Sequence, residues 1–282
     1  MVLTSVIKPS GILADYIRGF EFREINTLGE IMLKPIHAFH EALISIFISG
    51  ESVPLNSVTV RSKDYTATKT SQSFSGVMGL HSSMKGTFHF SGYYKIFNIQ
   101  FKPMGFTSIF KIPASVIMDK MYETGIVFNN DIKELHEQLN DCCCFVDMVH
   151  SAEKYLVKNL VKNKPKNSNH NLLKASNVLV NQPGAYSIEK LAYHTNMSLK
   201  TFERKFIDAV GLSPKLFVRI QRFNKALDLK TSQPALTWTS ICHQVGYYDQ
   251  NHFIKDFNAF AGLPPKAFFK NTPPPKEEFS FL

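Results

Sequence analysis

Apolar and polar positions follow a short-strand pattern in the first part of the chain. The run "ALISIFISG" is strand-like and ends at Gly50, and "SVTVRSKDYTAT" alternates in part. The run "GTFHFSGYYKIFNIQFKP" is dense in aromatic and β-branched residues, with turn-forming glycines between them. Short strands at close spacing are typical of a sandwich or a barrel. We therefore expect residues 1 to about 125 to be β-rich.

The pattern changes to a helical one at Asp131. Apolar residues recur from there at spacings near three, four and seven, which predicts two amphipathic helices near 131–140 and 145–162. The following stretch, "VKNKPKNSNHN", is polar and contains Pro165, as expected of a linker. Helical patterns then continue to "NTPPPKEEF", whose prolines cannot extend a helix.

These patterns predict an α+β multidomain fold. A β-rich domain, either a cupin-like barrel or a sandwich, ends in amphipathic helices and occupies residues 1–162. A linker at 163–170 leads to an all-helical domain at 171–271, and a Pro-rich tail follows at 272–282.

A repeat lies inside the helical domain. The segments "FERKFIDAVGLSPKLF" (202–217) and "FIKDFNAFAGLPPKAF" (253–268) share seven identities in 16 positions at an offset of 51. Upstream, Leu191-Ala192 matches Ile241-Cys242 at an offset of 50, which indicates one residue inserted in the turn. Self-similarity of this kind means that one structural unit is used twice.

Each unit has the pattern of two short helices joined by a turn. In the first unit Ser187 and Ser198 are placed as N-caps, and Gly211 is placed to end the second helix in a left-handed conformation. In the second unit Gly246 makes the turn and Asp249 caps the second helix. The apolar stripes of these second helices are Leu199, Phe202, Phe206 and Val210, and then Phe253, Phe257 and Phe260. Such a pair of helices is a helix-turn-helix.

The segment "SPKLFVRIQRFNKALDL" between the units predicts one long helix. Pro214 suits its first turn, because a helix leaves the first backbone N–H groups unpaired. One face of this helix is apolar. The other face is basic and carries Lys215, Arg219, Arg222 and Lys225.

The positive charge of the chain belongs to this helical part. The whole chain has 32 Lys and Arg against 23 Asp and Glu, a net of +9. Residues 166–270 hold 14 basic and 6 acidic residues, so their net is +8, and the remaining 18 basic and 17 acidic residues leave +1. A basic region of this kind favours a polyanionic partner, either nucleic acid or a membrane surface, although a merely solvated basic face is the alternative.

The C-terminal region resembles the DNA-binding domain of AraC/XylS-type bacterial transcription regulators, over about residues 171–270. That domain has two helix-turn-helix units joined by a long helix, and a signature near its end. The matching residues here are Gly246, Tyr247, Phe253, Phe257, Gly262 and Pro265. Tyr247 replaces the usual Phe, and Lys270 stands where members often have Arg. The segment "FSGYYKIFNIQFKPMGFTSIFKIP" is similar to the β-rich regulatory domain of such proteins, and 131–162 to the helices that pack on it or dimerise.

The resemblance implies two recognition helices, at about 198–210 and 249–261. They are expected in successive major-groove segments ~34 Å apart, with their N-terminal residues at the base edges. The base-reading candidates are Lys200, Glu203 and Arg204 in the first unit and Gln250, Asn251, His252 and Lys255 in the second. Arg suits guanine, Glu suits the cytosine amino group, and Gln and Asn suit adenine. Because the first set is charged and the second mostly neutral, we expect an asymmetric binding site; a solvated polar helix face is the alternative.

Phosphate contacts require cations or backbone amides, and they set register rather than sequence. The candidates are Lys190, Lys205, Arg219, Arg222, Lys225 and Lys266. Arg219 and Arg222 could instead pair with Asp208 or Asp228 inside the domain.

The expected function is that of a sequence-specific transcription regulator with double-stranded DNA as its partner. The N-terminal domain would modulate DNA binding through an unidentified small-molecule or protein effector, or through a homodimer formed by that domain and helices 131–162. Two alternatives remain open. One is an enzyme with a catalytic β domain that the basic domain localises, and the other is a non-specific architectural DNA binder.

Motifs for other chemistry are absent from the sequence. It has no nucleophile elbow, P-loop or dinucleotide-binding glycine motif, so we expect no enzyme, no catalytic residue and no cofactor. Its ten histidines, including His37 and His40, lack the close His-x-His spacing of a cupin metal site, so no metal is expected. Aromatics between Phe88 and Phe106 could line an effector pocket or fill the core.

The sequence also bears on compartment. Its four cysteines show no C-x-x-C spacing and favour free thiols in a reducing compartment. No signal peptide and no apolar run of membrane-spanning length is present, so a cytoplasmic location is expected.

Overall fold

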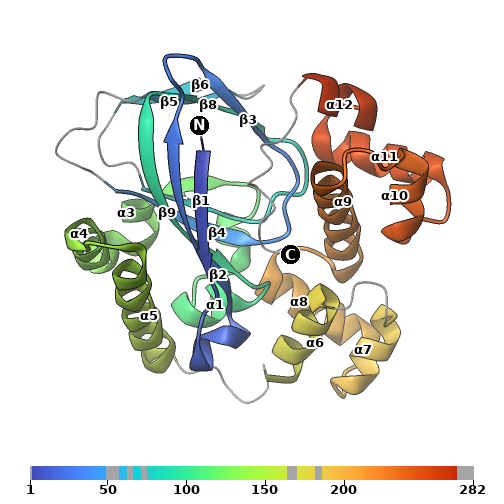
Figure 1. The fold of residues 1–282 in the computed structure, drawn as a ribbon. Coiled ribbons are helices and arrows are strands. Elements are labelled where there is room, and N and C mark those ends of the chain that lie inside the picture. The colour runs from blue at the N-terminus through green and yellow to red at the C-terminus, as the bar shows by residue number, and fades with distance from the viewer. Residues whose placement is uncertain are drawn as a thin grey trace.

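The computed structural model describes residues 2–48, 57–61, 66–70, 75–163, 170–181 and 186–271, with the backbone alone at 57–61, 66–70, 129–130 and 271. Within these residues the N-terminal half is built on two antiparallel sheets, and the C-terminal half is helical (Figure 1). The predicted α+β class is therefore confirmed. The predicted linker lies mostly outside the described residues, and the Pro-rich tail lies wholly outside them.

The larger sheet has six strands in the order β1-β2-β9-β4-β7-β10. Its strands are β1 (Val2–Ile7), β2 (Ile17–Asn26), β9 (Tyr93–Phe101), β4 (Ala42–Ile48), β7 (Ser75–Met78) and β10 (Met121–Glu123). The smaller sheet has the order β3-β8-β5-β6, made of β3 (Met32–Ile36), β8 (Gly86–Ser91), β5 (Ser57–Arg61) and β6 (Thr66–Thr70). The described strands thus form two sheets, and a small cluster of Ile25, Phe90, Tyr94 and Ile96 packs together from β2, β8 and β9.

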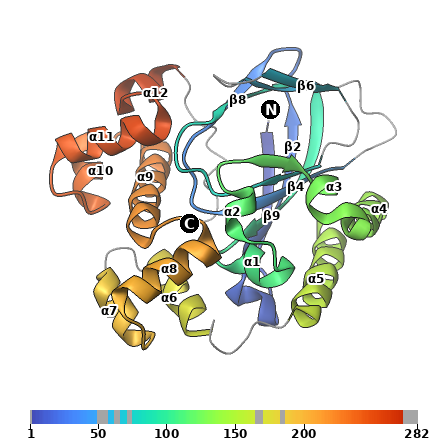
Figure 2. The same cartoon turned by 180° about the vertical axis from the view of Figure 1, so that it is seen from behind.

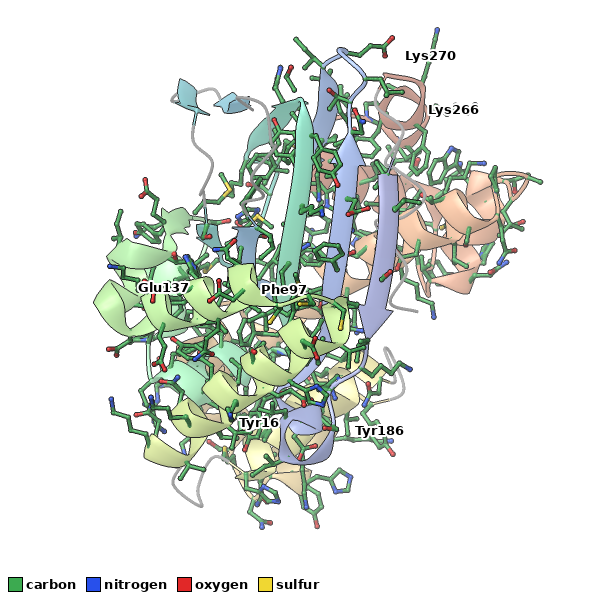
Figure 3. All side chains as sticks on the ribbon, turned by 60° about the vertical axis from the view of Figure 1, so that its left-hand side comes forward. Tyr16, Phe97, Glu137, Tyr186, Lys266 and Lys270 are labelled. Carbon is green, nitrogen blue, oxygen red and sulfur yellow. The ribbon has the colours of Figure 1, made fainter. Side chains whose placement is uncertain are left out.

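The strand predictions are confirmed where they were most specific. β4 alternates buried and half-buried side chains along its whole length, as the run "ALISIFISG" indicates. Gly92 adopts a φ of 116° between β8 and β9, a conformation that residues with a Cβ rarely reach. The side chain of Phe97 lies between the sheet and the helices outside it, 6.1 Å from Phe145 between ring centroids (Figure 3). Phe97, Phe101 and Phe106 are core residues rather than the lining of an open pocket.

The predicted end of the β-rich region, near residue 125, agrees with the last strand of the sheet, β10, which ends at Glu123. Two short helices that the sequence analysis missed lie before this strand, α1 (Gly105–Phe110) and α2 (Ala114–Ile117). The reason is local: Phe106, Ile109 and Phe110 are spaced three and four apart, so a helix buries them together. The chain then returns to the sheet in β10 and continues through α3 (Thr124–Phe128) and a 3-10 turn, η2 (Asn129–Ile132).

The two predicted amphipathic helices are confirmed as α4 (Lys133–Asp141) and α5 (Phe145–Lys162). They lie on the side of the sheet that faces away from the C-terminal helices (Figure 1). Phe145 packs on Phe22 and Phe97 of the sheet, and Leu135 and Leu139 of α4 are buried.

The C-terminal part consists of seven helices in the described residues. They are α6 (His170–Asn181), α7 (Ile188–His194), α8 (Leu199–Val210), α9 (Pro214–Ser232), α10 (Trp238–Gln244), α11 (Gln250–Ala261) and α12 (Pro265–Asn271). The predicted caps are all present: the side chains of Ser187, Ser198 and Asp249 accept hydrogen bonds from backbone N–H groups three residues on. Gly211 ends α8 with a φ of 92°.

The sheet domain and the helical domain share one apolar core. A continuous cluster of buried side chains runs from the sheet residues Phe20 and Ile99 through Ile109 and Ile117 to Phe217 and Phe223 of α9. Seen from behind, α1 and α2 lie between the sheet and α8 (Figure 2). Within the described residues, no helix is both long and apolar enough to cross a membrane.

Candidate nucleic-acid interface

α8 and α11, the second helices of the two units, are held on the domain by equivalent phenylalanines. Phe202 and Phe206 of α8 are fully buried, and so are Phe253 and Phe257 of α11 at the same positions of the repeat. Burying one such side chain stabilises the fold by roughly 2–3 kcal/mol. The stripe therefore determines which face of each helix remains outside.

The predicted base-reading side chains are all on that outer face. Lys200, Glu203, Arg204, Gln250, Asn251, His252 and Lys255 are each exposed. Arg204 lies 3.9 Å from Asp208 on the same helix, but both side chains are about two-thirds exposed, so this pair is weak and readily exchanged for another partner. His252 also lies beside two buried residues, with Nε2 3.9 Å from Asp256 Oδ1 and its ring 5.5 Å from that of Tyr247 between centroids. The N-terminal turns of α8 and α11 thus present mainly exposed polar groups.

The predicted phosphate contacts divide into two groups. Lys190, Lys225 and Lys266 are exposed, and Lys205 is half-buried. Lys270 extends from α12 away from the body of the protein (Figure 3). Arg219 and Arg222 are both half-buried, and their surroundings differ.

Arg219 is engaged inside the domain, though with neither of the two expected partners. Its guanidinium donates to both oxygens of Asp256, from Nη2 at 2.5 Å and from Nε at 3.2 Å. This charge-assisted hydrogen bond raises the pKa of Arg219 further. Arg219 therefore ties α9 to α11 and positions the second recognition helix, and the pairing with Asp208 or Asp228 was wrong.

Asp256 is a structural residue that the sequence reasoning missed. It is 1% exposed, and it also accepts a hydrogen bond from the Tyr247 hydroxyl at 3.0 Å. The tyrosine that replaces the usual Phe thus supplies a donor to a buried carboxylate. Burial and the nearby Asp256 charge raise the pKa of Tyr247, so its proton stays in place. The signal was available, since Asp256 follows Phe253 by three residues and so falls on the buried stripe.

Arg222 has no carboxylate partner among the described residues. Its guanidinium instead lies over the ring of Tyr247, with Cζ 5.9 Å from the ring centroid. Its Nε is also 3.9 Å from the point that a Cβ on Gly246 would occupy. This cation lies at the turn that precedes α11.

The N-terminal domain contacts the opposite, C-terminal ends of α8 and α11. The Thr107 hydroxyl donates to the carbonyl of Ala209 at 2.8 Å, and the Ala38 amide donates to the carbonyl of Phe260 at 3.0 Å. Ala209 and Phe260 are 51 residues apart, so they occupy the same position of the repeat. The N-terminal domain thus forms a hydrogen bond to each recognition helix at the same repeat position, near the C-terminal end of the helix. The exposed polar turns lie at the opposite, N-terminal ends.

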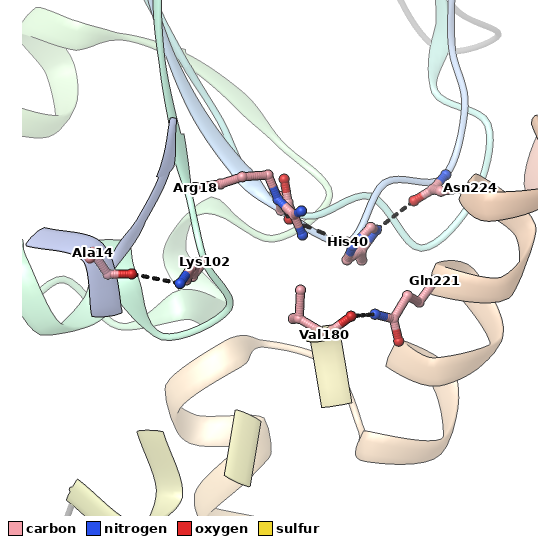
Figure 4. Close-up of polar contacts among 8 residues, drawn as sticks. Ala14, Arg18, His40, Lys102, Val180, Gln221 and Asn224 are labelled. Carbon is pink, nitrogen blue, oxygen red and sulfur yellow. Dashed lines mark hydrogen bonds and ion pairs between the residues drawn. The ribbon is translucent and has the colours of Figure 1, made fainter. Parts of the chain in front are cut away.

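Asn224 of α9 joins the two domains between these points. Its Nδ2 donates to the carbonyl of Ala38 at 2.9 Å, which leaves Oδ1 to accept from Nδ1 of His40 at 2.6 Å (Figure 4). His40 therefore carries its proton on Nδ1. Burial lowers the pKa of His40, against the opposing charge of Glu41, so the ring is neutral.

The two histidines that invited a metal hypothesis are interface residues. The ring of His37 meets the edge of Phe223 at 5.5 Å, and that of His40 meets Phe217 at 5.4 Å. In the part of the chain that the structure describes, no three His, Cys, Asp or Glu side chains are arranged to hold a metal ion.

A partly buried charge cluster lies beside Asn224. Glu41 is ion-paired with Arg18, and Asp228 faces this pair from α9. Burial raises the pKa of Asp228 to about 8, with Glu41 acting in the same direction and Arg18 and Lys225 against it. Folding therefore favours the protonated form of Asp228.

Two helix-turn-helix units on a shared long helix define the C-terminal part as a DNA-binding domain. Residues 191–271 match the family described as "Helix-turn-helix domain", so this part of the chain is a helix-turn-helix domain.

A curated relative and several solved structures are similar to the chain. An uncharacterised HTH-type transcriptional regulator from Haemophilus influenzae is 33% identical over 87 residues, 30% of this chain and 28% of that protein. The chain therefore matches less than a third of the length of this relative. ToxT from Vibrio cholerae O395 matches 96% of this chain and 98% of its own at 11% identity, with a TM-score of 0.45. A DNA-binding transcriptional dual regulator from Escherichia coli K-12 matches 39% of this chain and 95% of its own at 16% identity, with a TM-score of 0.31.

Proposed function

We propose that the protein is a sequence-specific DNA-binding transcription regulator and not an enzyme. The observation that carries the proposal is the repeated presentation of exposed polar side chains on the N-terminal turns of α8 and α11. Their basic surroundings favour the DNA backbone, because cations displace the counterions that duplex DNA condenses.

Base reading is assigned to the exposed residues of these turns. Lys200, Glu203 and Arg204 would read one major-groove segment, and Gln250, Asn251, His252 and Lys255 the next. Phosphate contacts are assigned to Lys190, Lys205, Arg222, Lys225 and Lys266. Arg219 is better described as a residue that positions α11, because Asp256 already engages its guanidinium.

Selection of bound duplexes from a random pool tests this function. The recovered motif is then measured with Arg204→Ala and Gln250→Ala, and with Asn258→Ala as a matched control at the exposed far end of α11. Each of the first two should relax preference at one part of the motif by about 1–3 kcal/mol, and the control should not. If neither relaxes base preference, the assignment of readers is wrong. If all duplexes compete equally, the protein is a non-specific binder.

The N-terminal domain is proposed to modulate DNA binding. Support comes from its hydrogen bonds to Ala209 and Phe260, since a domain that holds both recognition helices can alter their spacing and tilt. An unidentified small molecule or protein that shifts this domain would change the affinity for DNA as a coupling between sites.

A homodimer through the N-terminal domain and helices α4 and α5 is part of the proposal. Val146 and Val161 of α5 are about half exposed, which gives this surface apolar area to bury. Sedimentation of the full-length chain with and without Val146→Glu tests it. A wild-type dimer that dissociates on substitution supports this surface, and a wild-type monomer rules it out.

A further inference from the structure

The turns of the two helix-turn-helix units differ by one inserted residue, and the structure shows which one. The amide of Met197 donates to the carbonyl of Ala192 at 3.1 Å, and that of Tyr247 donates to Cys242 at 3.0 Å, an offset of 50. Asn196 and Gly246, one residue earlier, both have positive φ, 56° and 83°. The caps that follow, Ser198 and Asp249, are 51 apart. The inserted residue is therefore Tyr248.

Tyr248 is the most exposed large hydrophobic side chain among the described residues. It is 94% exposed, whereas its neighbour Tyr247 is 4% exposed and bonded to Asp256. The backbone therefore directs one tyrosine into the domain and the next one out, directly before the cap of α11. The hydroxyl of Tyr248 is free to donate a hydrogen bond, because no described residue accepts one from it.

Arg222 brings a guanidinium to the same turn. It packs on Tyr247 and passes close to Gly246, and it lacks the carboxylate that engages Arg219. At an offset of 50, the helix that precedes the first unit carries Leu172, which is 1% exposed. The first unit therefore has neither the extra tyrosine nor a matching arginine.

We propose that Tyr248 and Arg222 together form a contact for one DNA phosphodiester at the entrance of the second unit. The inference rests on the proposed function, in which the N-terminal turn of α11 enters a major groove. The residues just before that turn then meet the sugar-phosphate strand at the groove edge. The guanidinium supplies the charge and two donors, and the phenol supplies a third donor.

This site makes the second unit the more firmly anchored of the two. Its contact is independent of base sequence, so it adds affinity for any duplex and leaves discrimination to the readers. The first unit, which lacks this contact, would depend more on its charged reading residues.

The test measures binding of the full-length protein to the selected duplex and to a scrambled duplex over a range of salt concentrations. The variants are Tyr248→Ala, Tyr248→Phe and Arg222→Gln. Tyr193→Ala and Tyr193→Phe are matched controls. Tyr193 is a 79% exposed tyrosine on α7 of the first unit, and it does not belong to the turn that precedes α11. Thermal unfolding of each variant checks that the fold is kept.

Tyr248→Ala should weaken binding to both duplexes alike by about tenfold, the size expected for a hydrogen bond to a charged group. Tyr248→Phe should lose most of the same affinity. Arg222→Gln should lower the slope of log affinity against log salt by about 1. Neither Tyr193 variant should change binding.

Three results would overturn the proposal. If Tyr248→Ala binds DNA with wild-type affinity, Tyr248 does not contact the phosphodiester. If Tyr193→Ala weakens binding as much as Tyr248→Ala does, the loss is a general surface effect. A loss confined to one base position makes Tyr248 a base reader rather than a phosphate contact. If the wild-type protein binds no duplex at all, the proposed function fails together with this inference, whereas the other outcomes leave that function standing.

Discussion

Ala209 and Phe260 occupy the same position of the two recognition helices, and the backbone carbonyl of each accepts a hydrogen bond from the N-terminal domain. One donor is the Thr107 hydroxyl and the other is the Ala38 amide. The two helices are thus fixed to one body as well as to the long helix α9 between them. Their relative placement depends on the N-terminal domain, and the first prediction follows from this.

Thr107→Val removes the contact to α8 and leaves the contact to α11. The free energy of unfolding should fall by about 1 kcal/mol, the usual net value of one hydrogen bond. Because only α8 loses its contact with the N-terminal domain, the spacing of the two recognition helices becomes less fixed. Duplexes with one base pair added or removed between the two half-sites should therefore gain binding affinity relative to the selected duplex. Competition binding with this spacing series measures the effect. Thr239→Val, at an exposed position of α10, is the control, and an identical spacing preference in both variants would contradict the prediction.

Asp256→Asn breaks the bidentate pair with Arg219. We expect a loss of about 2 kcal/mol in the free energy of unfolding, below the range for fully buried pairs because the Arg219 side chain is 38% exposed. Urea denaturation measures it. Asp208→Asn is the matched control, since its ion pair with Arg204 is exposed and should contribute less than about 0.5 kcal/mol. Equal losses in the two variants would show that Asp256 has no special structural role.

Tyr247→Phe restores the residue that the family signature usually has, yet we expect it to destabilise this chain. The substitution removes the hydroxyl donor of a buried carboxylate, which should lower the free energy of unfolding by about 1–2 kcal/mol. In the Asp256→Asn background the same substitution should cost measurably less, because the two residues share one hydrogen bond. Strict additivity in this double-mutant cycle would rule out the coupling.

The contribution of Asp228 to stability should fall as pH rises from about 4 towards 8. The folded protein raises the pKa of Asp228 from 3.8 to about 8, so folding favours the protonated carboxyl group. This contribution is complete below the unfolded pKa and is lost progressively up to the folded pKa. The groups that face Asp228 are Arg18, Glu41 and Lys225, with His40 beside them.

Asp228→Asn removes that dependence. Its free energy of unfolding relative to the wild type should increase between pH 6 and pH 8 by more than about 1 kcal/mol. Urea denaturation at both pH values measures it. The neutral His40 acts in the opposite direction and at lower pH, because its folded pKa is depressed and stability is lost as the ring protonates. A difference between wild type and variant that does not change with pH would contradict the assignment.

Sequence reasoning located the helices of the repeat because their signals are local. Ser198, Asp249 and Gly211 each act within one turn of their own position, and the phenylalanine stripes follow helical spacing. The same reasoning missed the helix α1 inside the β-rich region, since it overlooked the helical spacing of Phe106, Ile109 and Phe110.

Contacts between distant segments were beyond such reasoning. Asn224 and His40 are 184 residues apart, and nothing near either residue indicates the other. The basic face of α9 showed that Arg219 and Arg222 are on one side, but the choice of Asp256 as a partner depends on how α11 crosses α9. The outward direction of Tyr248 likewise required the paths of both turns.

The shared apolar core has a consequence for how the chain comes apart. Phe217 and Phe223 of α9 are buried in the same cluster as Phe20 and Ile99 of the sheet. Unfolding of either half would therefore expose apolar surface of the other half to water and destabilise it. A single cooperative transition is therefore expected in calorimetry. A chain cut by protease between the halves should remain one particle in gel filtration, since the fragments are held together by packing and not by the peptide bond alone.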